Sequence, residues 1–304
     1  MSESSTFLDV EAVGHRRLRW LLAALAILGF VHPAWAIDPN RAMTQYLRTS
    51  WGAENGFSGG QVYAIAQTAD GYLWIGAEKG LFRFDGRSFL DVQPEIPVSS
   101  HATHVLGLTT DVNGDLWVRL LDTGLLHYHG GKFENVISDI ATPSSSVTAM
   151  SRSNEGGILV STLQHSVLHY NKGKLEILES KNLPSNLLIL SLAQTSDGRI
   201  WMGTRDYGLF YLRNGEAVPV TEGLPDKKIN CLLPVNGGKL WIGTDNGVAE
   251  WDGTRISTSD LPNSLSHIQV LTLVQDRDAN LWVGTSHGLL RFNHQDMARL
   301  NEQT

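Results

Sequence analysis

Short apolar segments separated by glycine- and aspartate-rich turns recur along the chain from residue 62 onward. The first unit divides into four such segments, which lie at Val62–Gln67, Leu73–Ala77, Leu81–Phe84 and Ser88–Val92. Each segment is short and bounded by turn residues, which is typical of a β-strand rather than a helix. The unit therefore predicts a four-stranded antiparallel meander, one blade of a β-propeller.

This unit is repeated at an interval of 40 to 43 residues. A phrase such as DGYLWIGAEKGLFRFDG marks each copy, and the tryptophans of the copies stand at Trp74, Trp117, Trp201, Trp241 and Trp282. The interval between Trp117 and Trp201 is twice as long as the others, and it contains a degenerate copy with Leu159 in the tryptophan position. The units begin near Val62, Val105, Val147, Ile189, Ile229 and Val270. A repeat of this length predicts a unit that stacks on copies of itself, so we expect an all-β fold, a β-propeller with six repeats.

The pattern leaves two forms of the ring open, a six-bladed ring and an incomplete seven-bladed one. Thr44–Trp51 predicts an isolated strand that would pair as the outer strand of the last blade. Residues 37–61 are therefore expected to be a lead-in with an outer closing strand, and residues 62–304 the propeller repeats. At the other end, either Asp296–Leu300 supplies the outer strand of the last blade or the ring is incomplete. Closure matters because an open blade leaves an unpaired sheet edge.

The repeated residues have structural roles. Asp-Gly or Asn-Gly pairs suit hairpin turns, because glycine takes a positive φ without a steric penalty. A tryptophan in mid-blade fills the wedge between two twisted sheets. A glycine two residues after it, at Gly76, Gly203, Gly243 and Gly284, allows close approach by a neighbour. Because a binding site is usually built once, these repeated columns are interpreted as scaffold.

The N-terminal 36 residues predict export. A basic segment that ends at Arg19 precedes the apolar run from Trp20 to Val31, and an A-x-A site follows at Ala34–Ala36. This order is that of a signal peptide, and the run is short for a membrane span. Residues 1–36 are therefore predicted to be a signal peptide that directs the chain to the periplasm.

Charge and cysteine content narrow the classes of partner. The net charge is −7, and no cluster of basic residues follows the N-terminus, which argues against a nucleic-acid partner. The single cysteine, Cys231, can form no internal disulfide, and its apolar surroundings predict a buried, inert thiol.

The repeated phrases resemble the two-component regulator propeller repeat, whose hallmark is D-G-x-L-W-x-G-T-x-x-G-L ahead of an aromatic residue and D-G. The resemblance covers about Tyr46–Phe292. It implies a periplasmic ligand-sensing module of a membrane sensor, which is followed in such proteins by a three-tyrosine domain, a membrane helix and a kinase or cyclase. The chain has none of these motifs, so we expect it to be truncated before any output domain. Arg119 and Ser161 replace the glycine after the tryptophan, which marks the second and third blades as irregular.

A ligand is expected on the face where the copies differ. The turns between the second and third strands and the loops between blades emerge there, and varied residues on a constant frame suit a binding surface. The short turns supply Glu78, Lys79, His165, Arg205, Asp206, Tyr207, Asp245 and His287, and the longer loops supply His101, His104, Lys227 and His267. Arg205, Tyr207, His165 and His287 are the best candidates for holding a carboxylate, a sulfate or a sugar.

No metal or cofactor is predicted. His127 and His129 share one face of a strand, but no third ligand is evident beside them in the sequence.

Three functions fit the sequence. The leading hypothesis is a non-catalytic module that binds a small molecule or oligosaccharide, either for a membrane sensor kinase or as part of one. A protein-interaction scaffold or truncated sensor remnant is the first alternative. The second is an exported lyase of the streptogramin-inactivating type, which would need a histidine and two or more carboxylates at the channel mouth. The sequence does not predict the oligomeric state.

Overall fold

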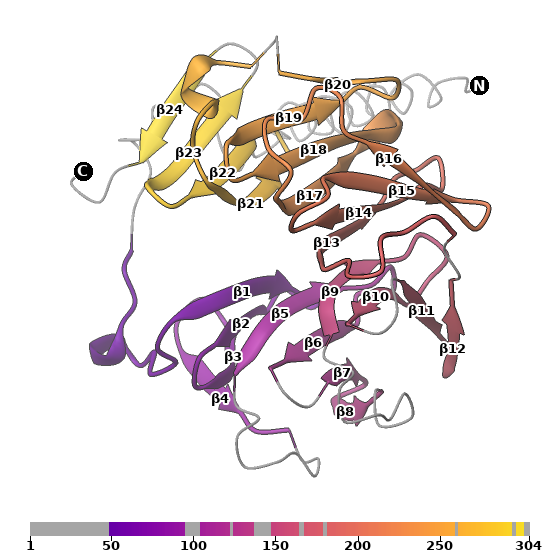
Figure 1. Ribbon diagram of the computed structural model, residues 1–304. Helices are drawn as coiled ribbons and strands as arrows, with labels where there is room; N and C mark the ends of the chain where they lie inside the picture. Colours follow the sequence, from indigo (N-terminus) through magenta and orange to yellow (C-terminus); the bar gives the residue numbers. More distant parts are fainter. Residues whose placement is uncertain are drawn as a thin grey trace, which may run out of the picture. The chain divides into compact units, whose positions relative to one another are not determined.

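The computed structural model describes residues 49–94, 104–121, 124–136, 147–163, 167–178, 181–258 and 261–293, together with the backbone of 296–300. These residues belong to one compact unit, residues 42–304. Its described strands form six antiparallel sheets of four strands each, which are the blades of a six-bladed β-propeller (Figure 1). The predicted signal peptide, 1–36, lies outside the described residues.

Each blade consists of four consecutive strands. Blades 1 to 3 contain β1 Val62–Gln67, β2 Leu73–Ala77, β3 Gly80–Phe84 and β4 Phe89–Val92; β5 Val105–Thr110, β6 Leu116–Leu120, β7 Gly124–His129 and β8 Lys132–Asn135; and β9 Val147–Arg152, β10 Ile158–Thr162, β11 Leu168–Asn171 and β12 Lys174–Ile177. Blades 4 to 6 contain β13 Ile189–Gln194, β14 Ile200–Thr204, β15 Leu209–Arg213 and β16 Glu216–Val220; β17 Ile229–Val235, β18 Lys239–Thr244, β19 Gly247–Trp251 and β20 Ile256–Ser257; and β21 Val270–Gln275, β22 Leu281–Thr285, β23 Gly288–Asn293 and β24 Asp296–Leu300.

The helices described are single 3-10 turns: η2 Ala53–Asn55, η4 Asn236–Gly238 and η5 Asn263–Leu265. Among the described residues, no helix has the length and apolar character needed to cross a bilayer.

The predicted blade boundaries are confirmed. The first strand of each blade, called its inner strand below, begins at the residue from which the repeat was counted, from Val62 in blade 1 to Val270 in blade 6. Of the two forms of the ring left open by the sequence, the six-bladed one is found.

The last blade takes its outer strand from its own repeat. β24 pairs with β23 over Asp296–Leu300, as one of the two sequence alternatives expected. The other expectation, a closing strand over Thr44–Trp51, falls largely outside the described residues. Its described end, from Thr49 to Trp51, is not in a strand. The described sheet of blade 6 consists of its own four strands, β21 to β24.

The tryptophan column forms the core between neighbouring blades. Trp74, Trp117, Trp201 and Trp241 are buried, and Leu159 is buried in the same position of blade 3. Trp74 packs with Val105 and Leu116 of the next blade. Each tryptophan therefore joins its own sheet to the following one, as the wedge-filling role predicts.

The glycine column allows this approach. A Cβ at Gly76 would lie 2.5 Å from a methyl group of Val105 in the next blade, and one at Gly203 would lie 2.6 Å from Ile229. Real Cβ atoms do not come this close to a neighbour. The first residue of the inner strand in blades 2, 5 and 6 therefore occupies the space that the missing side chain leaves in the preceding blade.

The indole N–H groups have partners that the sequence analysis missed. In blades 1, 2, 4 and 6, a hydroxyl or carboxylate six residues before the tryptophan accepts from Nε1, at 3.0 Å for Thr68 and Trp74 and at 2.8 Å for Asp276 and Trp282. A buried N–H needs such a partner, because an unpaired polar group in the core is destabilising. The threonine or aspartate six positions before the tryptophan was the feature of the sequence that could have predicted this hydrogen bond.

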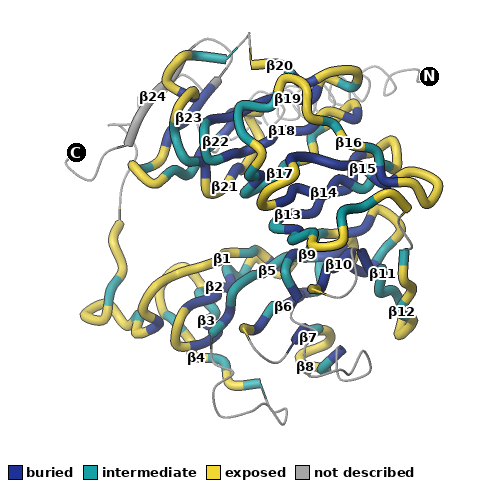
Figure 2. Tube along the Cα trace, in the orientation of Figure 1, coloured by how far each residue is buried: buried dark blue, intermediate teal, exposed yellow. Residues whose placement is uncertain are grey.

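The two ends of the array are less covered than its middle. β13 is almost entirely buried, whereas most residues of β1 and β21 are exposed (Figure 2). Ile65 on β1 is 63% exposed and Val274 on β21 is 55% exposed. The inner strands of the first and last blades thus carry apolar surface that is not covered by the described residues.

Candidate functional site

The inner strands of all six blades line a central channel of about 420 Å³. Strands run alternately between two faces of the propeller. The face with the inter-blade loops and the turns between second and third strands is called the loop face, and the face with the Asp-Gly turns is called the turn face. Hydroxyl, amide and thiol groups line much of the channel, contributed by Thr109, Thr148, Ser151, Ser191, Asn230, Cys231 and Thr272.

Arg119 is the one charged side chain among the described residues of this lining. It follows Trp117 on β6, in the column that is glycine in four other blades. Its Nη1 donates to the carbonyls of Val147 at 3.1 Å and Thr148 at 2.9 Å, and its Nη2 donates to that of Leu106 at 3.2 Å. The guanidinium therefore joins blade 2 to the start of blade 3, close to the loop face.

The charge of Arg119 is balanced by dipoles rather than by a carboxylate. Three of its five N–H groups are used on carbonyls, and Nε–H has no acceptor among the described residues. Burial lowers the pKa of Arg119, but a guanidinium keeps its proton at neutral pH. A fixed cation with spare donors in a polar channel is suited to an anionic ligand.

The opposite strand makes room for this arginine. Arg119 pairs with Gly107 on β5, and a Cβ there would lie 3.1 Å from Arg119 Nε. In blade 1 the corresponding pair is Ala64 and Gly76, so the glycine stands on the other strand. Blade 2 therefore exchanges the positions of the small and the large residue, and this directs a cation toward the channel.

Cys231 also lines the channel and is partly buried. Burial raises the pKa of its thiol to about 12, so the thiol stays protonated at neutral pH. This is the state expected of an inert thiol.

Two of the four strongest sequence candidates, Arg205 and Tyr207, lie on the exposed turn between β14 and β15. Arg205 Nε and Asp206 Oδ2 form an ion pair of 3.0 Å, and both side chains are more than half exposed. Tyr207 is 42% exposed, and its backbone N–H donates to Thr204 Oγ1 at 3.0 Å. Arg205 thus pairs with its neighbour at an exposed position, and its role as an anion ligand stays a prediction.

Asp245 lies in a network of side-chain hydrogen bonds. Its carboxylate accepts hydrogen bonds from Asn230 Nδ2 at 2.8 Å, Gln269 Nε2 at 3.1 Å and Lys228 Nζ at 3.0 Å. The hydrogen bond from Asn230 is the largest of the effects that lower the pKa of Asp245, with further contributions from Gln269 and Lys228. Asn230 also donates to Val270 O at 2.9 Å, so the network links blade 5 to blade 6.

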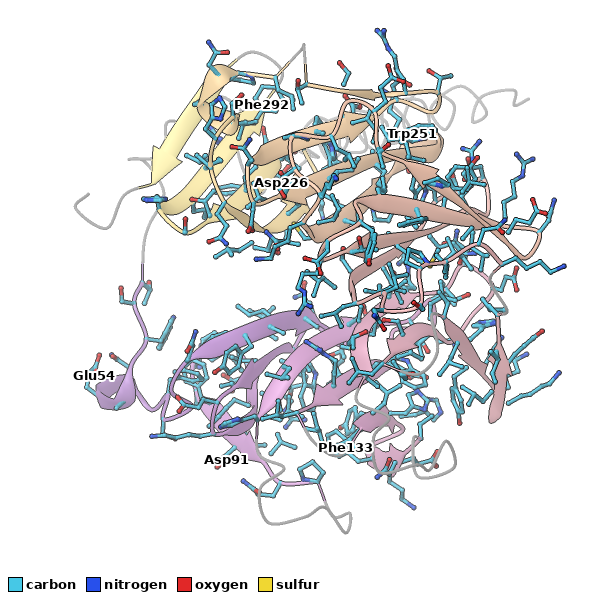
Figure 3. The ribbon with its side chains drawn as sticks, viewed as in Figure 1. Glu54, Asp91, Phe133, Asp226, Trp251 and Phe292 are labelled. Carbon is cyan, nitrogen blue, oxygen red and sulfur yellow. The ribbon has the colours of Figure 1, made fainter. Side chains whose placement is uncertain are left out.

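The other described candidates are separate positions on the loop face. Glu78 Oε2 accepts from the Gln61 N–H at 3.4 Å. His267 Nδ1 lies 3.1 Å from Asn246 Oδ1, and His287 Nδ1 lies 2.9 Å from Ser286 Oγ. Lys227 lies beside Asp226, which Figure 3 labels on the loop between β16 and β17. Lys79 is exposed and His104 is half-buried, and His101 and His165 lie outside the described residues.

A second cavity, of about 400 Å³, lies between blades 1 and 2. It is lined by Trp74, Tyr128, Phe133, Arg83 and Lys132, among others. Phe133 is labelled in Figure 3. Arg83 stacks over the ring of Tyr72 at 4.4 Å, so part of its charge is already engaged by an aromatic face.

Three segments of the chain match the sequence model of the two-component regulator propeller, at residues 56–79, 182–206 and 223–246. Each match covers an inner strand, its turn and the whole of the following tryptophan strand, in blades 1, 4 and 5. The chain thus contains two-component regulator propeller repeats. The resemblance seen in the repeated phrases is thereby confirmed. No curated protein matches the chain in sequence.

Solved structures similar to this regulator propeller include extracellular sensor domains. One is that of the hybrid two-component system BT3049 from B. thetaiotaomicron, with 23% identity and a TM-score of 0.69 over 84% of this chain and 36% of that one. Another is that of BT4673 from the same organism, with 24% identity and a TM-score of 0.63 over 83% and 34%. The chain thus spans about a third of the length of these two structures.

An enzyme also shares the architecture. Virginiamycin B lyase from Staphylococcus aureus is 14% identical, with a TM-score of 0.64 over 80% of this chain and 85% of that one. At these identities the likenesses show the fold alone. The repeats point to the family, and the solved structures point to the architecture. The charge in the candidate site is supplied by Arg119. Its departure from the glycine column was visible in the sequence, where it indicated only an irregular blade.

Proposed function

We infer that this chain is a non-catalytic, ligand-sensing propeller of a two-component-type signalling system, which acts in the periplasm after export directed by residues 1–36. The regulator propeller repeats and the sensor-domain architecture support the sensing role. Arg119 is the observation that carries the ligand-binding role, because it places a fixed positive charge in a channel whose other described lining residues are uncharged. Signalling would require a membrane sensor kinase, as a partner or as the rest of the same protein.

The ligand class follows from the chemistry of the channel. A guanidinium with a spare Nε–H binds carboxylate, sulfate or phosphate oxygens, and hydroxyl and amide groups around it suit a polyhydroxylated body. An acidic or sulfated sugar fits this combination. Arg119 lies near the loop face, so the exposed Tyr207, Lys227, His267 and His287 are proposed as contacts for the part of a ligand that extends out of the channel.

The test is a binding comparison between the wild-type chain and a double variant, Arg119→Gly with Gly107→Ala. This variant gives blade 2 the pair that blade 1 already has, so the blade is expected to fold. Isothermal titration calorimetry and thermal shift are measured with acidic, sulfated and neutral oligosaccharides. We expect an acidic or sulfated ligand to stabilise the wild-type chain and to bind the variant roughly 10- to 100-fold more weakly, the value of one charged hydrogen-bonding group.

Lys132→Ala, in the cavity between blades 1 and 2, is the matched control and should leave the affinity unchanged. Unchanged affinity in the folded double variant would place the ligand outside the channel. If no anionic compound stabilises the wild-type chain, the proposed ligand class is wrong.

A lyase is the second candidate, because the lyase structures match most of both chains. It would require a histidine and carboxylates at the channel, and the described lining holds neither. Incubation with a streptogramin B compound decides the matter. Its conversion by the wild-type chain would overturn the non-catalytic proposal, whereas an unchanged compound supports it.

A further inference from the structure

Four titratable side chains gather on the turn face of blade 2, away from the loop face and its predicted ligand contacts. Asp111 and Asp115 lie on the turn between β5 and β6, and His127 and His129 lie on β7. One ligand atom from each of Asp111, Asp115 and His127 lies within 4.8 Å of the others. The sequence showed no third ligand beside the histidines, because the aspartates come from a different strand connection.

Blades 1, 4 and 5 show what is ordinary at this position. The residue two positions before the tryptophan contacts the residue opposite the tryptophan on the third strand. These contacts are complementary pairs: Arg83 over the Tyr72 ring at 4.4 Å, Arg199 over the Tyr211 ring at 5.3 Å, and Lys239 with Glu250 at 3.2 Å. Asp115 and His127 are the corresponding pair of blade 2.

This pair differs from the others in leaving a nitrogen unsatisfied. His127 Nε2 is buried and has no hydrogen-bond partner, although Asp115 Oδ2 lies only 3.4 Å away. The carboxylate of Asp115 instead contacts His129 Nδ1 at 2.8 Å. A buried imidazole nitrogen without a partner is destabilising unless another group occupies its lone pair.

Two atoms at that nitrogen have the spacing of neighbouring ligands in a metal site, and the third ligand atom lies within 4.8 Å of both. Zn²⁺ binds histidine nitrogen and carboxylate oxygen at about 2.0–2.2 Å, so two ligand atoms of a tetrahedral site lie roughly 3.3–3.6 Å apart. The separation of His127 Nε2 and Asp115 Oδ2 is 3.4 Å. We propose that Asp111, Asp115 and His127 bind a divalent transition-metal ion, with zinc the best fit.

The surroundings hold two of these ligands in place. The ring of His127 is stacked on Trp117, with centroids 4.1 Å apart and planes inclined by 16°. Asp111 Oδ1 accepts the backbone N–H groups of Asn113 at 2.9 Å and Asp115 at 3.1 Å, and Oδ2 accepts Trp117 Nε1 at 3.2 Å. Such outer contacts orient metal ligands, and a carboxylate oxygen keeps a second lone pair for the ion.

The donor set selects the class of metal. Calcium and magnesium prefer sites built from oxygen alone, whereas an imidazole favours zinc, copper, nickel and related ions. Two carboxylates also balance the charge of a divalent ion.

The experiment uses the untagged full chain after treatment with a chelator. Calorimetric titration with Zn²⁺ should show one equivalent bound and a rise in Tm. Co²⁺ should give the visible absorption of a tetrahedral complex and should quench part of the tryptophan fluorescence, because Trp117 touches the ligand ring.

Two variants and a matched control complete the test. His127→Gln and Asp115→Asn should each weaken Zn²⁺ binding by about tenfold or more. His169→Ala should bind as the wild type does, because His169 occupies the same column of blade 3 but its Nε2 lies 2.9 Å from a carbonyl, that of Gly156. Failure of the wild-type chain to bind Zn²⁺ or Co²⁺, or undiminished binding by a folded His127→Gln or Asp115→Asn chain, would overturn the proposal.

Discussion

One turn position in each blade requires a positive φ, and the residue there decides whether the backbone is strained. The position three before the tryptophan has a positive φ throughout: it is 89° at Gly71, 84° at Gly198 and 64° at Ala279. Glycine adopts this region freely, whereas a residue with a Cβ is strained there by roughly 1–2 kcal/mol. Blade 6 therefore carries strain that the other turns avoid.

We predict that Ala279→Gly raises the free energy of unfolding by roughly 0.5–1 kcal/mol, because relief of strain exceeds the added entropy of the unfolded chain. Gly71→Ala is the reverse change at the equivalent position. A Cβ at Gly71 would meet no atom within 4 Å, so only backbone strain should act, and the variant should lose roughly 1 kcal/mol. Urea denaturation measures both. Equal stability of all three proteins would show that the turn tolerates alanine without strain.

Connections between elements depend on a few polar side chains placed at blade boundaries. Asp245 gathers donors from β17 and from the loop that precedes β21. Its pKa in the folded chain lies below its ordinary value of 3.8, chiefly because Asn230 donates to the carboxylate. A lowered carboxyl pKa stabilises the fold above the unfolded pKa, and that contribution is lost as the pH falls through the folded pKa.

Asp245→Asn should therefore reduce the free energy of unfolding at pH 7 by roughly 1–2 kcal/mol and flatten the loss of stability below about pH 4. Urea denaturation at several pH values between 7 and 3 measures the effect. Asp206→Asn is the control, since its exposed ion pair with Arg205 is expected to contribute little. A pH dependence in Asp245→Asn that is as steep as in the wild-type chain would refute the assignment.

Across the whole molecule, the inner strands of different blades differ in their exposure to solvent. Ile65 and Leu192 occupy the same inner-strand position of blades 1 and 4, yet Ile65 is 63% exposed and Leu192 is 5% exposed. The difference arises because Leu192 packs in a core shared with blade 3, whereas the corresponding surface of blade 1 has no such neighbour among the described residues.

We predict that Ile65→Asn changes the free energy of unfolding by no more than about 0.5 kcal/mol, while Leu192→Asn costs about 3 kcal/mol or more. Thermal and urea unfolding of the two variants test this. A large cost for Ile65→Asn would mean that the inner strand of blade 1 is covered in solution.

Much of the scaffold could be predicted from the sequence, because blades are made of consecutive residues. Short apolar segments, turn residues and the repeat located the inner strands, and they offered Asp296–Leu300 as one of two alternatives at the last blade. The tryptophan and glycine columns also follow from local periodicity, since each repeat solves the same packing problem against its neighbour. The candidate site was less accessible, and Asp245, chosen as a ligand contact, lies in a network that joins two blades.

What the sequence by itself determined is therefore the blade, its number of copies and the family of its repeats. The tertiary structure decided which of the residues that depart from the repeat pattern line the channel, and which of them contact each other across strands. Arg119 donates hydrogen bonds to carbonyls that are 28 and 29 residues away in the sequence. His127, on β7, lies close to Asp111 and Asp115, which are on the turn between β5 and β6. Such contacts depend on how successive sheets stack and on which face a side chain takes, and neither is contained in a local pattern.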